Sequence, residues 1–169
     1  MNINKSAEYW IKKLKLAEHP EGGYFTETYR CEELLEGVRS PDRYQGDRPF
    51  STAIYFLLKS DQYSAFHRLI SDEIWHFYAG SSLTLHLIMK NGEYRPLRLG
   101  PESDKNESFQ RVVPAMTWMA ASVTQPDSYT LVGCTVSPGF VFSDFEMGDQ
   151  KKLVLQYPQH RGIIKKFTG

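Results

Sequence analysis

The stretch SAFHRLISDEIWHFYAG, Ser64–Gly80, combines strand-like alternation with several side chains capable of acid–base chemistry. In a strand, successive side chains point to opposite faces, so His67 and Leu69 share one face. After a turn at the following serine and aspartate, Glu73 and Trp75 re-enter the same interior. The alternate residues of the same strand point to the opposite face, which is the outside of the barrel or a subunit interface. They are Ile74, His76 and Tyr78. The stretch therefore predicts one wall of a small-molecule pocket inside a β-barrel.

Short strands separated by turn residues continue on both sides of this stretch. TAIYFLLK (52–59) and YTLVGCTV (129–136) are rich in β-branched and aromatic residues. LTLHLIM (83–89) alternates and is followed by Asn91-Gly92, the dipeptide best suited to a two-residue hairpin turn. About eight or nine such strands, with helices only at the ends, predict an all-β antiparallel barrel or double-sheet jelly roll.

The two ends of the chain have helical rather than strand periodicity. Near the start, apolar residues at helical spacing share one face: Ala7, Trp10, Ile11 and Leu14. Near the end, Asp149 is placed to cap a helix. We therefore expect a single domain over residues 1–169, with an N-terminal helix in 1–20, a β-barrel in 22–146 and a C-terminal helical segment in 149–167.

Charge, cysteine content and the N-terminal sequence indicate which partners the protein can bind and in which cellular compartment it is expected. Lysine plus arginine and aspartate plus glutamate number 20 each, so no net field attracts nucleic acid or an anionic membrane. Cys31 and Cys134 are too few and too far apart for a disulfide framework. The N-terminus lacks the apolar run of a signal peptide. We expect a cytoplasmic protein that binds neither nucleic acid nor membrane.

The same central stretch resembles the first signature of the cupins, in which H-x-H precedes a glutamate and a glycine. His67, Leu69, Glu73 and Gly80 match that spacing. Three segments more narrowly resemble a small family of uncharacterised single-domain cupins sometimes labelled predicted sugar epimerases: HPEGGYFTETYR, SAFHRLISDEIWHFYAG and YTLVGCTVSPGFVFSDFE. The resemblance implies a cupin jelly-roll barrel. It also implies a homodimer, for which the extended stretch 22–30 offers an edge.

The chain departs from the cupin pattern at the residues that usually bind metal. Leu69 replaces the second histidine, and Met119 stands where the last histidine of the family is expected. Leucine cannot bind a metal, and a thioether suits soft ions such as Cu(I). We expect no metal cofactor. A weak site at His67 and Glu73 stays open, with Cys134 or His76 as a further ligand.

The retained residues suggest acid–base chemistry without a metal. A buried Glu73 that accepts a hydrogen bond from His67 would fix the tautomer of the imidazole and raise its basicity. Metal-free sugar epimerases of the cupin fold use a tyrosine as acid; Tyr55 is the candidate here, and Tyr24 or Tyr78 would serve equally well. The expected ligand-binding residues are Trp75, Trp118, Met119, Cys134 and Phe140.

Three functions compete on this reading. The first is a metal-independent isomerase or epimerase acting on a small polar molecule of the carbohydrate class. The second is a binding or sensor module that holds such a molecule without chemistry, and the third is a metal-dependent cupin enzyme with an altered ligand set. A structural role is the plain alternative for each residue: His67 as a hydrogen-bonded strand residue and Cys134 as an inert core thiol.

Overall fold

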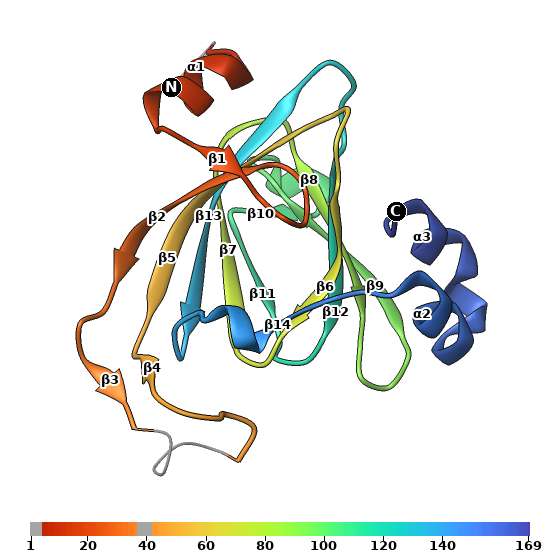
Figure 1. Cartoon of the computed structure of the whole chain (residues 1–169). Helices are drawn as coiled ribbons and strands as arrows, with labels where there is room; N and C mark the ends of the chain where they lie inside the picture. The colour runs from red at the N-terminus through yellow and green to blue at the C-terminus, as the bar shows by residue number, and fades with distance from the viewer. Residues whose placement is uncertain (1–4, 37–41) are drawn as a thin grey trace.

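Two six-stranded β-sheets face each other in the computed structural model, which describes residues 5–36 and 42–169 (Figure 1). The first sheet has the order β1 (Ala17–Glu18), β2 (Tyr24–Arg30), β5 (Thr52–Lys59), β13 (Tyr129–Ser137), β7 (Asp72–Gly80) and β11 (Gln110–Val113). The second has the order β10 (Glu107–Ser108), β9 (Tyr94–Leu99), β8 (Leu83–Ile88), β12 (Trp118–Val123), β6 (Ser64–Leu69) and β14 (Phe145–Met147). The strands pair antiparallel except β9 with β10. The predicted all-β jelly-roll barrel is confirmed.

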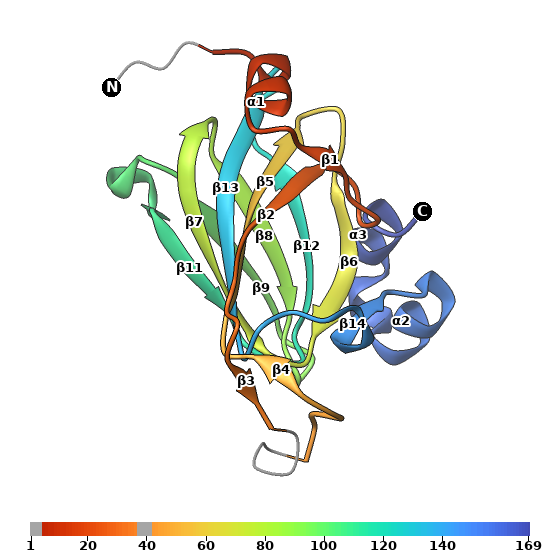
Figure 2. The ribbon, with the colours of Figure 1, turned by 60° about the vertical axis from the view of Figure 1, so that its left-hand side comes forward.

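Smaller elements lie at the ends and edges of this barrel. A hairpin of β3 (Leu34–Leu35) and β4 (Arg48–Pro49) extends beyond β2 and β5 (Figures 1 and 2). The helical elements are α1 (Ala7–Lys13), η2 (Ser103–Lys105), η3 (Phe142–Asp144), α2 (Gln150–Gln156), η4 (Pro158–His160) and α3 (Arg161–Lys166). Among the helices in the described residues, none has the length and apolar character needed to cross a bilayer.

The space between the sheets is filled by residues of one strand parity. On β8, Leu83, Leu85 and Leu87 alternate inward and are almost fully buried. On β5, Phe56 and Leu58 do the same from the opposite sheet. The hairpin predicted at Asn91-Gly92 is confirmed, because β8 pairs antiparallel with β9. Its turn is longer than the two residues expected: the backbone N–H of Met89 donates to the carbonyl of Glu93, and of the pair Asn91-Gly92 only Gly92, with a φ of 81°, has a positive φ. These side chains fill the space between the sheets except at one end of the barrel, where a cavity lies.

The outer face of each sheet is covered in part by helices. Helix α1 begins after Ser6, whose hydroxyl caps it, and packs with Leu57 and Leu131 of the first sheet. It ends at Lys13, and β1 follows, so the helix occupies only part of the segment 1–20 assigned to it. Helices α2 and α3 lie against the outer face of the second sheet (Figure 1). Asp149 caps α2 as predicted, at 2.8 Å from the backbone nitrogen of Lys152.

Candidate functional site

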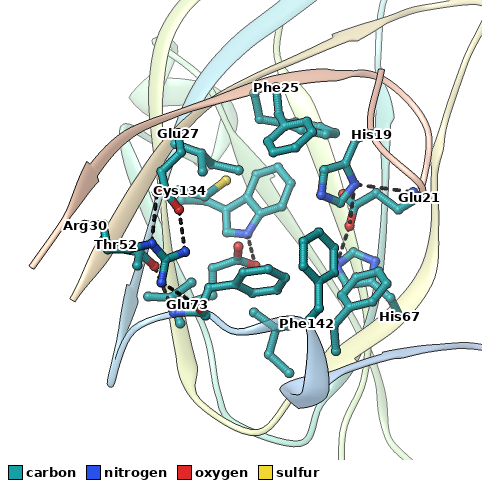
Figure 3. Close-up of a pocket in the computed structure, with 17 residues that line it drawn as sticks. His19, Glu21, Phe25, Glu27, Arg30, Thr52, His67, Glu73, Cys134 and Phe142 are labelled. Atoms are coloured by element: carbon teal, nitrogen blue, oxygen red, sulfur yellow. Dashed lines mark hydrogen bonds and ion pairs between the residues drawn. The ribbon is translucent and has the colours of Figure 1, made fainter. Parts of the chain in front are cut away.

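A cavity of about 100 Å³ lies between the two sheets at the end nearest β14, with room for several waters or a small organic molecule (Figure 3). Strands of both sheets contribute inward-pointing side chains to it. The segment between β13 and β14 closes it on one side. The lining residues are His19, Glu21, Phe25, Glu27, Arg30, Thr52, Ile54, Phe56, His67, Leu69, Glu73, Trp75, Cys134, Val136, Phe140, Phe142 and Phe145.

His67 and Glu21 form a hydrogen-bonded pair on one wall of the cavity. Nδ1 of His67 lies 2.8 Å from the carbonyl oxygen of Ala65, which can only accept, so Nδ1 carries a proton. Nε2 of His67 lies 3.1 Å from Oε2 of Glu21. The two facing atoms therefore share one proton. Ser64 donates a second hydrogen bond, of 2.8 Å, to Oε1 of Glu21.

Burial sets the charge of this pair. It raises the pKa of Glu21 to about 7, against smaller opposing effects of His19 and of the Ser64 hydroxyl. It lowers the pKa of His67, although Glu73 and the carbonyl of Ala65 act in the opposite direction. Both shifts favour the uncharged pair, in which the Glu21 carboxyl holds the proton and donates it to Nε2.

His19 is a second imidazole beside Glu21. Its Nδ1 accepts the backbone N–H of Glu21 at 3.3 Å and lies 3.6 Å from the carboxylate oxygen Oε2. Burial lowers the pKa of His19, so the ring is neutral at neutral pH and carries its proton on Nε2. Among the described residues, Nε2 of His19 has no hydrogen-bond partner, so its N–H is available to a bound molecule.

A glycine turn brings His19 and Glu21 to the cavity. Gly22 and Gly23 have φ values of 105° and 76°, a region that other residues adopt at a cost. A Cβ on Gly22 would lie 2.2 Å from the carbonyl oxygen of Tyr63, so the turn packs directly against the connection before β6. The backbone N–H of Ala65 then donates to the carbonyl of Glu21 at 2.7 Å. The sequence predicted neither His19 nor Glu21 as a site residue, although both lie in the segment HPEGGYFTETYR.

Glu73 occupies a separate wall and has neutral hydrogen-bond donors. The indole Nε1 of Trp75 donates to its Oε2 at 2.7 Å (Figure 3). The Cys134 thiol is a second donor. Burial raises the pKa of Glu73 to about 7; the nearby His67 acts against the rise, and Glu21 adds to it. Burial and the two glutamates also raise the pKa of the Cys134 thiol, so that thiol is not an activated nucleophile.

The predicted hydrogen bond between His67 and Glu73 is wrong. Both side chains line the cavity, yet the carboxyl that hydrogen-bonds to His67 is that of Glu21. Glu73 does not pair with Arg68 or Arg111 either. Arg68 pairs with Glu146, and Arg111 donates to backbone carbonyls.

The tyrosines proposed as acids lie outside the cavity. Ile54 and Phe56 point inward from β5, so Tyr55 points to the outer face of the sheet. There its ring meets that of Tyr78 edge to face at 5.8 Å. Tyr24 packs with the same outer cluster. The assignment of Tyr55 as catalytic acid is therefore wrong, as are its two alternatives.

Of the expected ligand-binding residues, the structure brings three to the cavity and leaves two elsewhere. Trp75, Cys134 and Phe140 line it. Trp118 faces outward, where it packs against the C-terminal helices and under the guanidinium of Arg68 at 4.5 Å. Met119 is buried in the core between the sheets and does not line the cavity. Those two assignments are corrected.

The entrance is formed by an ion pair and by three phenylalanines. Arg30 donates from Nε at 3.0 Å and from a terminal nitrogen at 2.6 Å to the two carboxylate oxygens of Glu27. Its other terminal nitrogen donates to the carbonyl of Phe140 at 3.1 Å. Phe140, Phe142 and Phe145 form what we call the aromatic rim, and the Phe142 side chain is 64% exposed.

The chain has two facing sheets around a cavity, with His67 and Glu73 on the consecutive strands β6 and β7, one in each sheet. This arrangement defines a protein of the cupin class. The family model Cupin_5, described as Cupin superfamily (DUF985), matches residues 8–148, and the chain belongs to this family. The prediction from the central motif that the chain is a cupin is thus confirmed.

Several solved and curated proteins are similar to the chain. Protein SO0799 of Shewanella oneidensis is 39% identical with a TM-score of 0.88, over 98% of each chain. A hypothetical protein from Leishmania major is 37% identical with a TM-score of 0.89, over 97% of this chain and 99% of that one. The uncharacterized protein YML079W of Saccharomyces cerevisiae is 29% identical over 82% of this chain and 73% of its own length.

A more distant likeness concerns the fold alone. Oxalate decarboxylase of Bacillus subtilis matches 90% of this chain and 36% of its own, with 11% identity and a TM-score of 0.55.

The donor set does not fit the metal that the cupin fold implies. Leu69 lines the cavity beside His67, at the place of the family's second histidine. Within residues 5–36 and 42–169, no three His, Cys, Asp or Glu side chains are grouped as metal ligands. His76 cannot complete a site, because it bonds to Thr135 at 3.1 Å and to Gln110 on the outer face. The cavity residues form hydrogen bonds with one another instead.

Proposed function

We propose that the cavity is the active site of a metal-independent isomerase or epimerase acting on a small hydroxylated carbonyl compound of the carbohydrate class. The observation that carries this proposal is the presence of two acid–base groups on different walls of one buried cavity. Glu73 is one group, and the Glu21–His67 pair is the other. Burial raises the pKa of both glutamates to about 7, where proton transfer in either direction is efficient at neutral pH.

The proposed reaction moves one proton off the substrate and one onto it. The ionised Glu73 removes the proton from the carbon next to the carbonyl. Glu21, protonated within its pair with His67, then donates a proton to the carbon from another side or to the oxygen. Protonation of the carbon gives an epimer, and exchange with solvent afterwards removes the proton from Glu73 and restores it to Glu21. Protonation of the oxygen gives an enediol, which becomes the isomer when Glu73 returns its proton to the former carbonyl carbon and the neighbouring hydroxyl gives its proton to Glu21.

His19 supports the negative charge that develops on the substrate oxygen. A neutral imidazole with Nδ1 occupied by the backbone N–H of Glu21 presents Nε2–H as a donor. A donor aimed at a developing enolate oxygen in a water-poor site is worth more than in bulk water. This role replaces the tyrosine acid expected from the sequence, and it uses a residue on the glycine turn.

Incubation with aldoses and ketoses in D₂O tests the proposal. We expect deuterium to enter the substrate at the carbon next to the carbonyl, followed by NMR. Glu73→Gln removes the base, and the exchange rate should fall by about 100-fold or more. Glu93→Gln, an exposed change in the β8–β9 connection, is the matched control and should exchange at the unmodified rate. Exchange that is absent for every sugar, or equally fast in Glu73→Gln, would overturn the proposal.

A binding module without chemistry is the second candidate, and one observation favours it. Both ring nitrogens of His67 are engaged within the protein, by Ala65 and by Glu21. A ligand that raises the melting temperature by mass action, with no deuterium exchange, would support this second function over the first.

We also propose that two copies associate through β2. Strand β1 pairs only with Tyr24 and Phe25, so the stretch of β2 from Thr26 to Arg30 presents an open edge within the described part of the sheet (Figure 1). Tyr29, at this edge, is 53% exposed. Light scattering should give a mass near twice 19.5 kDa. Thr28→Pro prevents a further strand from pairing with this edge, so it should lower the mass to that of one chain if two copies associate there. An unchanged dimer would place the interface elsewhere.

We further propose a cytoplasmic location. Cys31 and Cys134 are both free, and Cys134 is buried. Unpaired thiols suit a reducing compartment.

A further inference from the structure

The charged groups in the cavity favour one sign of ligand charge. Glu21, Glu27 and Glu73 line it, whereas Arg30 is the one lysine or arginine among its lining residues. Arg30 gives two hydrogen bonds to Glu27 and one to the carbonyl of Phe140, so the guanidinium is already neutralised at the entrance. An anionic ligand would meet two further carboxyls in the interior and no free cation.

Glu73 is a carboxylate without a permanent counter-charge, because the nearby His67 is buried and burial keeps its imidazole neutral. It is 7% exposed and faces the cavity. Its donors, the indole of Trp75 and the thiol of Cys134, are both uncharged. An ionised buried carboxylate without a cation is costly. A cation placed in the cavity would offset that cost.

Aromatic rings line the same space in two groups, one at the entrance and one deeper. From the entrance inward, Phe142 contacts Phe140 at 5.1 Å between ring centroids, and Phe140 contacts Phe145 at 6.2 Å. Deeper in the cavity, Phe56 meets Trp75 edge to face at 5.7 Å. Ring faces attract organic cations, and the attraction is strongest where water is excluded. Aromatic walls and an uncompensated carboxylate together are the two elements of an organic-cation site.

We propose that the cavity binds a small hydroxylated amine, such as an amino sugar, with its ammonium group beside Glu73 and within the aromatic wall. This inference rests on the proposed active site and names its substrate class. The amine would hold Glu73 in its ionised form, which is the form that accepts a proton in the proposed reaction. The Arg30–Glu27 pair excludes phosphorylated and carboxylated sugars at the entrance.

Three probes that share one ring and differ in charge test this inference: glucosamine, glucose and glucuronate. Titration calorimetry is carried out slightly below neutral pH, where the amine is protonated. Glucosamine should bind at least about tenfold more tightly than glucose, and glucuronate should not bind. Ethanolamine, ethylene glycol and glycolate repeat the comparison at the smallest size. Equal affinity for amine and neutral probes in both series, tightest binding of the acid, or no binding in either series would overturn the inference.

Two variants locate the preference within the site. Glu73→Gln should remove the advantage of glucosamine over glucose, whereas Glu93→Gln should keep it. Glu27→Gln frees Arg30 and should allow glucuronate to bind. Because Glu27 is at the exposed entrance, this variant gives a readout even if Glu73→Gln alters the fold. An amine preference without deuterium exchange would sustain this inference and remove the proposed reaction, and exchange on neutral sugars alone would do the reverse.

Discussion

Replacing Glu73 with glutamine is expected to stabilise the protein by roughly 2–3 kcal/mol at about pH 8, while removing the proposed activity. The cause is burial: Glu73 is nearly inaccessible, has only neutral donors, and has its pKa raised to about 7 from a usual 4.5. Glutamine keeps an oxygen for the indole of Trp75 and carries no charge. It therefore resembles the protonated carboxyl that the fold prefers.

The direction of the pH dependence follows from the same shift. Between about pH 4.5 and 7 the folded chain holds a proton on Glu73 that the unfolded chain has released. The unfolded state then binds fewer protons, so stability falls as the pH rises through this window. Above pH 7 both states are ionised, and the full cost of the buried carboxylate is present. Glu21, raised to about 7 by burial, adds a contribution of the same sign.

Urea unfolding at about pH 5 and about pH 8 measures this effect. The stabilisation by Glu73→Gln should be large at the higher pH and small at the lower one. Glu93→Gln, on the exposed turn, should change neither value by more than about 0.5 kcal/mol. A variant that is less stable than the unmodified protein at the higher pH would show that the carboxylate is compensated in the fold, contrary to the geometry.

The inward or outward direction of side chains could be predicted for strands in which apolar and polar residues alternate, because only one face of such a strand is apolar. In DEIWHFYAG, alternation correctly placed Glu73 and Trp75 inward and His76 outward, because the side-chain period of two is a local property. In TAIYFLLK both faces are apolar, since α1 covers the outer one. The sequence of that strand therefore does not indicate which face is inside, and this is why the prediction that Tyr55 faces the cavity was wrong.

Glu21 and His19 were missed because non-local contacts place them. Gly22 and Gly23 favour a turn, but the turn reaches the cavity only through its contact with Tyr63 and the hydrogen bond from Ala65. Neither contact has a signature in the sequence near the turn. Trp118 was misplaced similarly, since the C-terminal helices that bury it lie far along the chain. That His67 and Glu73 line one cavity was thus predictable, whereas the hydrogen-bond partner of His67 was not.

Breaking the buried ion pair between Arg48 and Asp144 is expected to cause the largest loss of stability. Arg48 on β4 and Asp144 on η3 are 2% and 6% exposed. The carboxylate accepts two hydrogen bonds from the guanidinium, one of them 2.7 Å from Nε. Arg48 also donates to the carbonyls of Gln45 and Gly46. Asp144→Ala leaves a buried guanidinium without its counter-charge and should cost about 3–5 kcal/mol.

The same substitution should also weaken ligand binding, because η3 lies within the aromatic rim. Asp144 follows Phe142 by two residues and precedes Phe145, and both rings line the cavity. Urea unfolding gives the stability, and calorimetry with the amine probe gives the affinity. Glu146→Ala, which breaks the exposed pair with Arg68, is the matched control and should cost at most about 1 kcal/mol.

A double variant separates lost charge compensation from lost packing. Arg48→Met combined with Asp144→Leu replaces both charges with apolar groups and should recover much of the stability lost in Asp144→Ala, as buried pairs elsewhere do when both partners are replaced. If Asp144→Ala costs no more than Glu146→Ala, the pair is not buried in solution as it is here. If the double variant is as unstable as the single one, the hydrogen bonds from the Arg48 guanidinium to Gln45 and Gly46 are needed for stability. These bonds would then fix the residues just before β4, beside the aromatic rim.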